Sequence, residues 1–537
     1  MTAAKSGDLL LTAESVHTMD RTQPVAEAVL VRGDRVIATG TRKEVESLAS
    51  PSSDRIDLPG ATLIPGLIES HVHPVYTGLT QDWVDCRSPL RGSIADIQAG
   101  LRERLSAPGW VRGWGYDDTL IAEGRHLTRD ELDAVSMDRP VILQHISAHF
   151  LVANTVALAA AGVTESSIAE DDPRFPRGED GRLTGLAWEI DAVSKIVAAV
   201  PPLAPGDVRD ALLASLRLAR SRGITTLHDL GVGLMAGAEE LAAYRGLAAT
   251  GGLPIHVVGF LCGDLALPAI ADGSVRFEAG GSADGRFRLA GAKFWSDGSI
   301  QGLSAALRVP YMCDPGHCGD LLHPQEVLDD MVARVHLAGG QAAVHANGDA
   351  AVRATITALA RAQRLDGRRA RHRIEHCQVT LPDDLDAIVR EELGVSFFAN
   401  HVYYWGDRHR DRFLGAERAR EMDPLARADG LGIRFGLHSD CPITPMDPLH
   451  TIRTASTRLT SGGDVLGAAQ RISPDRAVQA MTLDSAYLVH DEHEVGCLAP
   501  GRRADLVVLD APIDSLGDPS AAMPQPVQVM VDGEWET

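Results

Sequence analysis

The segment PGLIESHVHP (Pro65–Pro74) is a short apolar run that ends in two histidines one residue apart. Alternate side chains of an extended strand project to the same face, so His71 and His73 are expected to point together. Two incidental histidines would give the same pattern, and the meaning of this segment therefore depends on the rest of the chain.

Seven more short apolar runs follow, and several of them are separated by stretches with the apolar spacing of helices, such as residues 207–222 and 325–338. The runs are ITTLHDL (224–230), PIHVVGF (254–260), AKFW (292–295), QAAVHANGD (341–349), RIEHC (373–377), GVSFFANH (394–401) and GIRFGLHSD (432–440). Strands that alternate with helices form parallel sheets. Eight such units predict an α/β fold, a (β/α)₈ TIM-like barrel.

Both ends of the chain are rich in short strand patterns, unlike the middle. Residues 1–60 and 485–537 are expected to form one small β-sandwich domain, because neither end alone has enough strands for a stable core. Two separate hairpin units are the alternative. The barrel domain then spans residues 61–484. Residues from about 80 to 220 are too many for one loop and predict an insertion after the first barrel strand, with a lid or pocket wall as its use.

The composition of the chain argues against nucleic acids and membranes as partners. The formal net charge is −22, whereas a nucleic-acid-binding protein needs a basic face. No apolar run reaches the roughly 18 residues of a membrane span. The seven cysteines lack the spacing of a disulfide framework, which indicates a reducing compartment. We therefore expect a cytoplasmic protein that acts on a small molecule and has no nucleic-acid or membrane partner.

Several of the other runs also end in residues that bind metals. His345 ends the fifth run, His376 the sixth and Asp440 the eighth, and Lys293 lies in the fourth. The carboxyl ends of barrel strands meet at one rim, where catalytic groups lie. Histidines and a carboxylate that converge there match divalent cations such as Zn²⁺, although each residue alone could be a buried polar group of the core.

These motifs resemble the amidohydrolase superfamily of metal-dependent hydrolases, and within it the YtcJ-like, amidohydrolase-3 branch. The resemblance covers nearly the whole chain. The matching motifs are PGLIESHVHP, TGLAWE (184–189), GAKFWSDGSIQG (291–302), QAAVHANGDAAV (341–352), RIEHCQ (373–378), GLHSDCPITPMDP (436–448) and GRRADLVVLD (501–510).

The resemblance implies a role for each matching residue. His71, His73 and Asp440 would bind the more buried metal, and His345 with His376 the second metal. Lys293 would bridge the two ions as an N-carboxylated lysine, since a free ammonium offers no acceptor. A lysine that forms a salt bridge near a single metal is the alternative, with Glu189 as the rival anionic ligand. The expected cofactor is one or two divalent ions, with Zn²⁺ ahead of Mn²⁺, Fe²⁺ and Ni²⁺.

The implied function is hydrolysis of a non-peptide C–N bond of a small molecule. The metals would lower the pKa of bound water and polarise the carbonyl, and Asp440 would be the catalytic proton carrier. The branch is similar to N-substituted formamide deformylases, which puts N-formyl or N-acyl amines first. Cyclic amides, carbamates, deamination of a heterocycle and a non-enzymatic regulatory relative are the alternatives.

Three further residues are candidates for contact with the substrate. His228 and His401 end the second and seventh runs, which predicts that they face the same rim of the barrel. Glu189 in the insertion would be the third, if it is not a metal ligand. Homo-oligomer formation is compatible with the sequence.

Overall fold

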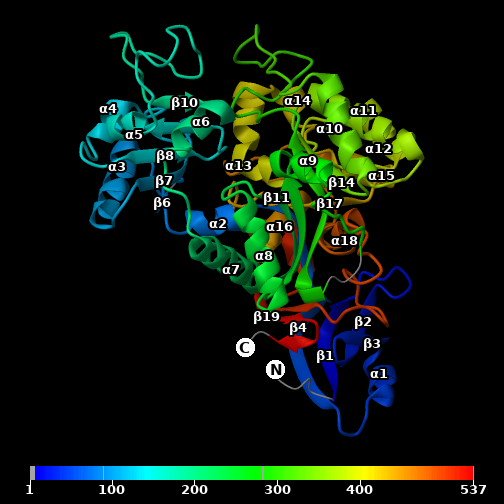
Figure 1. The fold of residues 1–537 in the computed structure, drawn as a ribbon. Helices are drawn as coiled ribbons and strands as arrows, with labels where there is room; N and C mark the ends of the chain where they lie inside the picture. The colour runs from blue at the N-terminus through cyan, green and yellow to red at the C-terminus, as the bar shows by residue number, and fades with distance from the viewer. Residues whose placement is uncertain (1–6, 89, 281–283, 536–537) are drawn as a thin grey trace. The chain divides into compact units, whose positions relative to one another are not determined.

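The computed structural model describes residues 7–88, 90–280 and 284–535, and Figure 1 shows its ribbon. Eight parallel strands form one sheet in the order β17-β16-β15-β14-β13-β12-β11-β5, and the end strands β5 and β17 contact each other. The strands are β5 (Leu67–Val72), β11 (Ile224–Val232), β12 (His256–Cys262), β13 (Phe287–Trp295), β14 (Gln341–Ala346), β15 (Arg373–His376), β16 (Gly394–Phe397) and β17 (Phe435–Leu437). The predicted α/β barrel is confirmed, with a strand in each of the eight runs.

Helices connect these strands and explain why nearly every strand residue is buried. The two predicted helices correspond to α7 (Pro205–Ser221) and α10 (Gln325–Leu337). In the described part of the chain, no helix combines the length and the apolar character that crossing a membrane requires. The other helices described between Ala238 and Leu488 are α8 (Ala238–Ala249), α9 (Gly263–Ala271), α11 (Asp349–Asp366), α12 (Pro382–Glu391), α13 (Asn400–Arg408), α14 (Ala416–Ala419), α15 (Leu425–Gly430), α16 (Pro448–Thr457), α17 (Pro474–Ala480) and α18 (Leu483–Leu488).

The two ends of the chain build one seven-stranded sheet, in the order β20-β19-β18-β4-β1-β2-β3. Strand β4 pairs in parallel with β1 on one side and antiparallel with β18 on the other, so the termini form a joint sheet instead of separate hairpins. Residues 1–6 and 536–537 of the predicted terminal domain lie outside the described residues, and its exact boundaries stay a prediction. The strands are β1 (Asp8–His17), β2 (Val25–Arg32), β3 (Arg35–Gly40), β4 (Asp54–Pro65), β18 (Leu506–Leu509), β19 (Pro526–Val531) and β20 (Glu534–Trp535). Helix α1 (Arg42–Leu48) follows β3.

Residues 75–211 form a compact unit of their own, which we call the inserted unit. Its sheet has the order β10-β9-β8-β7-β6. Its use as a lid stays a prediction. The strands are β6 (Val84–Asp85), β7 (Val111–Tyr116), β8 (Val141–His145), β9 (Phe150–Ala153) and β10 (Leu186–Trp188). The helices are α3 (Ile94–Glu103), α4 (Arg129–Asp133), α5 (Thr155–Ala160) and α6 (Glu189–Val197), and α2 (Pro74–Thr80) leads into the unit.

A row of hydrogen bonds links the barrel sheet to the surface. The Ala342 amide donates to His372 Nδ1 (2.9 Å), His372 Nε2 lies 2.9 Å from His336 Nδ1, and His336 Nε2 lies 2.7 Å from Asp366 Oδ1. Since His372 Nδ1 accepts, its Nε2 must donate to His336, and His336 in turn donates to Asp366. Each ring therefore carries exactly one proton.

This arrangement makes stability depend on pH. Burial is the main cause that lowers the pKa of His372 well below its ordinary value near 6.5, and the nearby Arg368 guanidinium acts in the same direction. The folded chain then binds fewer protons than the unfolded chain. The stabilisation is full above about pH 6.5 and is lost as the pH falls below that value.

We expect the variant His372→Gln to lose free energy of unfolding less steeply than the wild type between pH 6.5 and 5.5, by about 1 kcal/mol over this pH unit. Glutamine can still accept and donate but does not titrate. Urea unfolding at several pH values measures the difference. His493→Gln, at an exposed position, is the control and should match the wild type. Parallel pH profiles for His372→Gln and wild type would contradict this origin of the pH dependence.

Candidate metal centre

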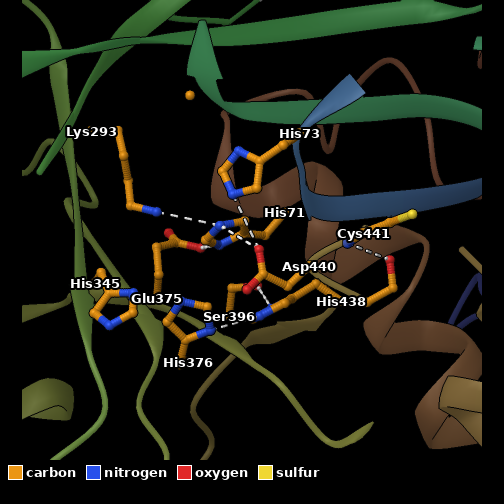
Figure 2. Close-up of polar contacts among 12 residues, drawn as sticks. His71, His73, Lys293, His345, Glu375, His376, Ser396, His438, Asp440 and Cys441 are labelled. Carbon is orange, nitrogen blue, oxygen red and sulfur yellow. Dashed lines mark hydrogen bonds and ion pairs between the residues drawn. The ribbon is translucent and has the colours of Figure 1, made fainter. Parts of the chain in front are cut away.

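The predicted histidine pair lies at the carboxyl end of β5. His71 is the penultimate residue of this fully buried strand, and His73 is the first residue after it. The two rings meet edge to face with centroids 5.2 Å apart. Figure 2 shows both rings directed toward Asp440.

Backbone hydrogen bonds bring Asp440 to this pair. The Asp440 amide donates to the His71 carbonyl (3.1 Å), and the His73 amide donates to the Cys441 carbonyl (3.0 Å). Asp440 Oδ1 lies 3.4 Å from His71 Nε2 and 3.2 Å from His73 Nε2. Side chains from the first and last barrel strands therefore meet at one point.

Glu375 determines which nitrogen of His71 carries the proton. Arg373 donates two hydrogen bonds to the Glu375 carboxylate, at 2.8 and 3.0 Å, so this carboxylate is an acceptor. His71 Nδ1 lies 2.8 Å from Glu375 Oε2 and must donate to it. Burial, with the nearby charge of Lys293, lowers the pKa of His71 well below its ordinary value. The ring is therefore neutral, and Nε2 keeps its lone pair.

The His71 Nε2 lone pair thus faces a carboxylate oxygen. Asp440 Oδ1 is buried and makes no hydrogen bond with any described residue. Two acceptor atoms at this distance repel each other unless a cation lies between them. Imidazole nitrogen and carboxylate oxygen are ligands of Zn²⁺ and similar ions, so His71, His73 and Asp440 fit a divalent metal.

The other predicted metal residues extend this cluster across neighbouring strands. Lys293 Nζ, on β13, lies 3.3 Å from His71 Nε2, which agrees with a lone pair on that nitrogen. Burial lowers the pKa of Lys293. The ring of His376, at the end of β15, has its centroid 4.9 Å from that of His71 and 4.5 Å from that of His345 on β14. Contacts therefore connect all six residues that were predicted to hold metal.

A second buried carboxylate supports the segment that carries Asp440. Glu69, on β5, accepts hydrogen bonds from the amide and the hydroxyl of Ser439 at 2.9 and 3.1 Å. Burial raises the pKa of Glu69 to about 8. These bonds attach the residue before Asp440 to the first strand and so fix the direction of the Asp440 side chain.

The three residues predicted to contact substrate lie in different surroundings. His228 is fully buried within β11 and accepts a hydrogen bond from Arg373 through Nδ1 (3.0 Å). His401 lies in the first turn of α13, because β16 stops before it. Glu189 begins α6 in the inserted unit, where its Oε2 lies 2.9 Å from His149 Nδ1. Their contact with substrate stays a prediction.

Sequence reasoning did not single out His438. Its ring stacks on that of His71 with centroids 4.8 Å apart, and its Nε2 lies 3.1 Å from His376 Nδ1. His438 stands two residues before Asp440, the same spacing that drew attention to His71 and His73. This spacing is the sequence signal that could have drawn attention to it, although both residues lie beyond the end of β17 (Phe435–Leu437).

Comparison with known proteins agrees with this architecture. The model described as "Amidohydrolase family" matches residues 54–535, which is most of the chain. The chain belongs to the amidohydrolase family. The resemblance of its motifs to this group is thereby confirmed.

The amidohydrolase is similar along almost its whole length to two curated proteins. It is 28% identical to the putative amidohydrolase YtcJ of Bacillus subtilis (strain 168), over 96% of this chain and 95% of that protein. It is 26% identical to the N-substituted formamide deformylase of Arthrobacter pascens, over 94% of each. Its fold is similar to that of an uncharacterised metal-dependent hydrolase from Pyrococcus horikoshii, with a TM-score of 0.77 and 21% identity, over 96% of this chain and 100% of the other.

Gly231, on β11, has no side chain, and the His73 ring lies in the space that a side chain at this position would fill. A Cβ atom at this position would lie 2.7 Å from His73 Nδ1 and 3.1 Å from His73 Cε1. We expect Gly231→Ala to displace the His73 ring and to weaken metal binding on the order of tenfold, measured as competition with a chelator. Gly246→Ala on α8, where no atom lies within 4 Å of the added Cβ, is the matched control. Equal metal affinity in the two variants would contradict this placement of His73.

Proposed function

We propose that this amidohydrolase cleaves a non-peptide C–N bond of a small molecule with the help of bound metal, and that N-formyl or other N-acyl amines are its first candidate substrates. The observation that carries the proposal is the pair of facing acceptors, His71 Nε2 and Asp440 Oδ1. Similarity to a formamide deformylase supports the choice of substrate class. Cyclic amides, carbamates and amino-heterocycles, which the same chemistry would hydrolyse, are the alternatives.

The ligand set favours Zn²⁺, because it combines imidazole nitrogens with a carboxylate. Lys293 would join it in an N-carboxylated form and bridge two ions, since an ammonium has no lone pair to donate. Bound metal would polarise the scissile carbonyl and lower the pKa of the attacking water. The proposed ligands are His71, His73, Lys293, His345, His376 and Asp440.

Asp440 is the residue to which we assign proton transfer. Its side chain is 12% exposed, whereas His71 is fully buried, so a substrate can reach the carboxylate. The carboxylate accepts a proton from the attacking water and donates it to the departing nitrogen, because an amine leaves poorly unless it is protonated. Water oxygen bonds to the carbonyl carbon as the C–N bond breaks, and the products are a carboxylic acid and an amine.

Replacing Asp440 by Asn removes the proton acceptor while it nearly preserves the size of the side chain. We expect kcat/KM to fall about 10²–10⁴-fold, with a folded protein by circular dichroism. Asp383→Asn, at an exposed position in the first turn of α12, is the control and should keep full activity. Activity of Asp440→Asn within tenfold of wild type would refute the assigned role.

Metal removal tests the proposal as a whole. Dialysis against a chelator should abolish hydrolysis of a panel of N-formyl amines, N-acyl amines, cyclic amides and carbamates, and added Zn²⁺ should restore it, because carbonyl polarisation depends on the ion. The rate of amine release with each compound ranks the substrate classes. Hydrolysis at an unchanged rate in metal-free protein would show that the proposed chemistry is wrong.

A further inference from the structure

A row of buried polar groups runs from the backbone of β17 to His376. Ser70 Oγ lies 2.9 Å from the Leu437 carbonyl oxygen and 2.7 Å from Ser396 Oγ. Ser396 Oγ lies 2.7 Å from His438 Nδ1, and His438 Nε2 lies 3.1 Å from His376 Nδ1. Figure 2 shows the His376 and His438 end of this row.

The direction of every hydrogen bond in the row follows from its backbone end. The carbonyl of Leu437 can only accept, so the Ser70 hydroxyl donates to it. Each hydroxyl has one proton, so Ser396 must donate to Ser70 and accept from His438 Nδ1.

The same reasoning determines which nitrogen of His376, the proposed metal ligand, carries the proton. With its proton on Nδ1, the neutral ring of His438 has a lone pair on Nε2. His376 must then donate from Nδ1 to His438. Its own lone pair is left on Nε2.

If every hydrogen bond of the row ran in the opposite direction, one contact would have no proton between its two atoms. If His438 donated to His376, Ser396 would donate to His438 and Ser70 to Ser396. The Ser70 and Leu437 oxygens would then face each other at 2.9 Å with no proton between them. These side chains are 0–2% exposed, so water does not replace the missing bond, and a buried polar group without a partner destabilises the fold.

We propose that His438 is a positioning residue: it holds His376 in the tautomer whose Nε2 binds metal, and it is not a metal ligand itself. His438 would otherwise be a candidate ligand, because ring nitrogens of His71, His376 and His438 lie close enough together to hold one ion. The hydrogen bond from His376 uses the His438 Nε2 lone pair, which is the only one the neutral ring has. The inference rests on the proposed function, because it takes His376 as a ligand.

Three variants separate this role from a merely structural one. His438→Asn can still reach Ser396 but is too short to accept from His376. His438→Gln places an amide oxygen where it can accept from His376 Nδ1. Ser396→Ala removes the partner that holds the proton on His438 Nδ1 and makes the smallest change in volume. Ser485→Ala is the control, because Ser485 is buried and its hydroxyl donates to the Ala480 carbonyl outside the row.

The measurement is the Zn²⁺ affinity of the full-length chain, by competition with a chromophoric chelator, with circular dichroism to confirm folding. We expect Kd to rise about 10–100-fold in Ser396→Ala and His438→Asn, and to stay near the wild-type value in His438→Gln and Ser485→Ala. This pattern separates a positioning role from packing, since packing would not favour Gln over Asn.

Three other results would contradict the proposal, and each contradicts a different part of it. Unchanged affinity in Ser396→Ala and His438→Asn, with wild type binding Zn²⁺, would overturn the positioning role and leave the proposed function intact. Equal losses in His438→Asn and His438→Gln would overturn Nε2 as the acceptor. A wild-type chain that binds no Zn²⁺ would overturn the proposed function and this inference with it.

Discussion

The site depends on two acceptor atoms that face each other, His71 Nε2 and Asp440 Oδ1, 3.4 Å apart. Neither atom has a proton for the other, because His71 gives its only proton to Glu375. Two acceptor atoms this close repel each other when no cation lies between them. A divalent cation bound by both atoms removes this repulsion, so metal binding and the chemistry proposed for the site come from the same arrangement.

The rest of the barrel keeps this arrangement in place. Parallel strands bring their carboxyl ends to one edge, and the ligand candidates come from strands β5, β13, β14 and β15 or from the residues just after β5 and β17. Behind them, the buried pair of Arg373 and Glu375 fixes His71. The row through Ser396 and His438 does the same for His376. Each of these two histidines, on different strands, is therefore held in one orientation by hydrogen bonds in which donor and acceptor are fixed.

The sequence predicts the barrel well because both faces of its strands are covered, and each strand is then a continuous apolar run. It also predicts the ligand candidates, since alternation along a strand places His71 and His73 together. The role of His438 depends on Ser70 and Ser396, which are 326 residues apart, and sequence spacing carries no information on such contacts. The sequence does not predict the sheet of the inserted unit, because strands as short as Val84–Asp85 show no periodicity.

Anomalous X-ray diffraction at the zinc edge, from crystals of the zinc-loaded protein, tests the central claim most directly. The account predicts a peak about 2.0–2.2 Å from His71 Nε2, His73 Nε2 and an Asp440 carboxylate oxygen. Crystals that contain zinc but show peaks only elsewhere, with His71 Nε2 and Asp440 Oδ1 still facing each other, would contradict it.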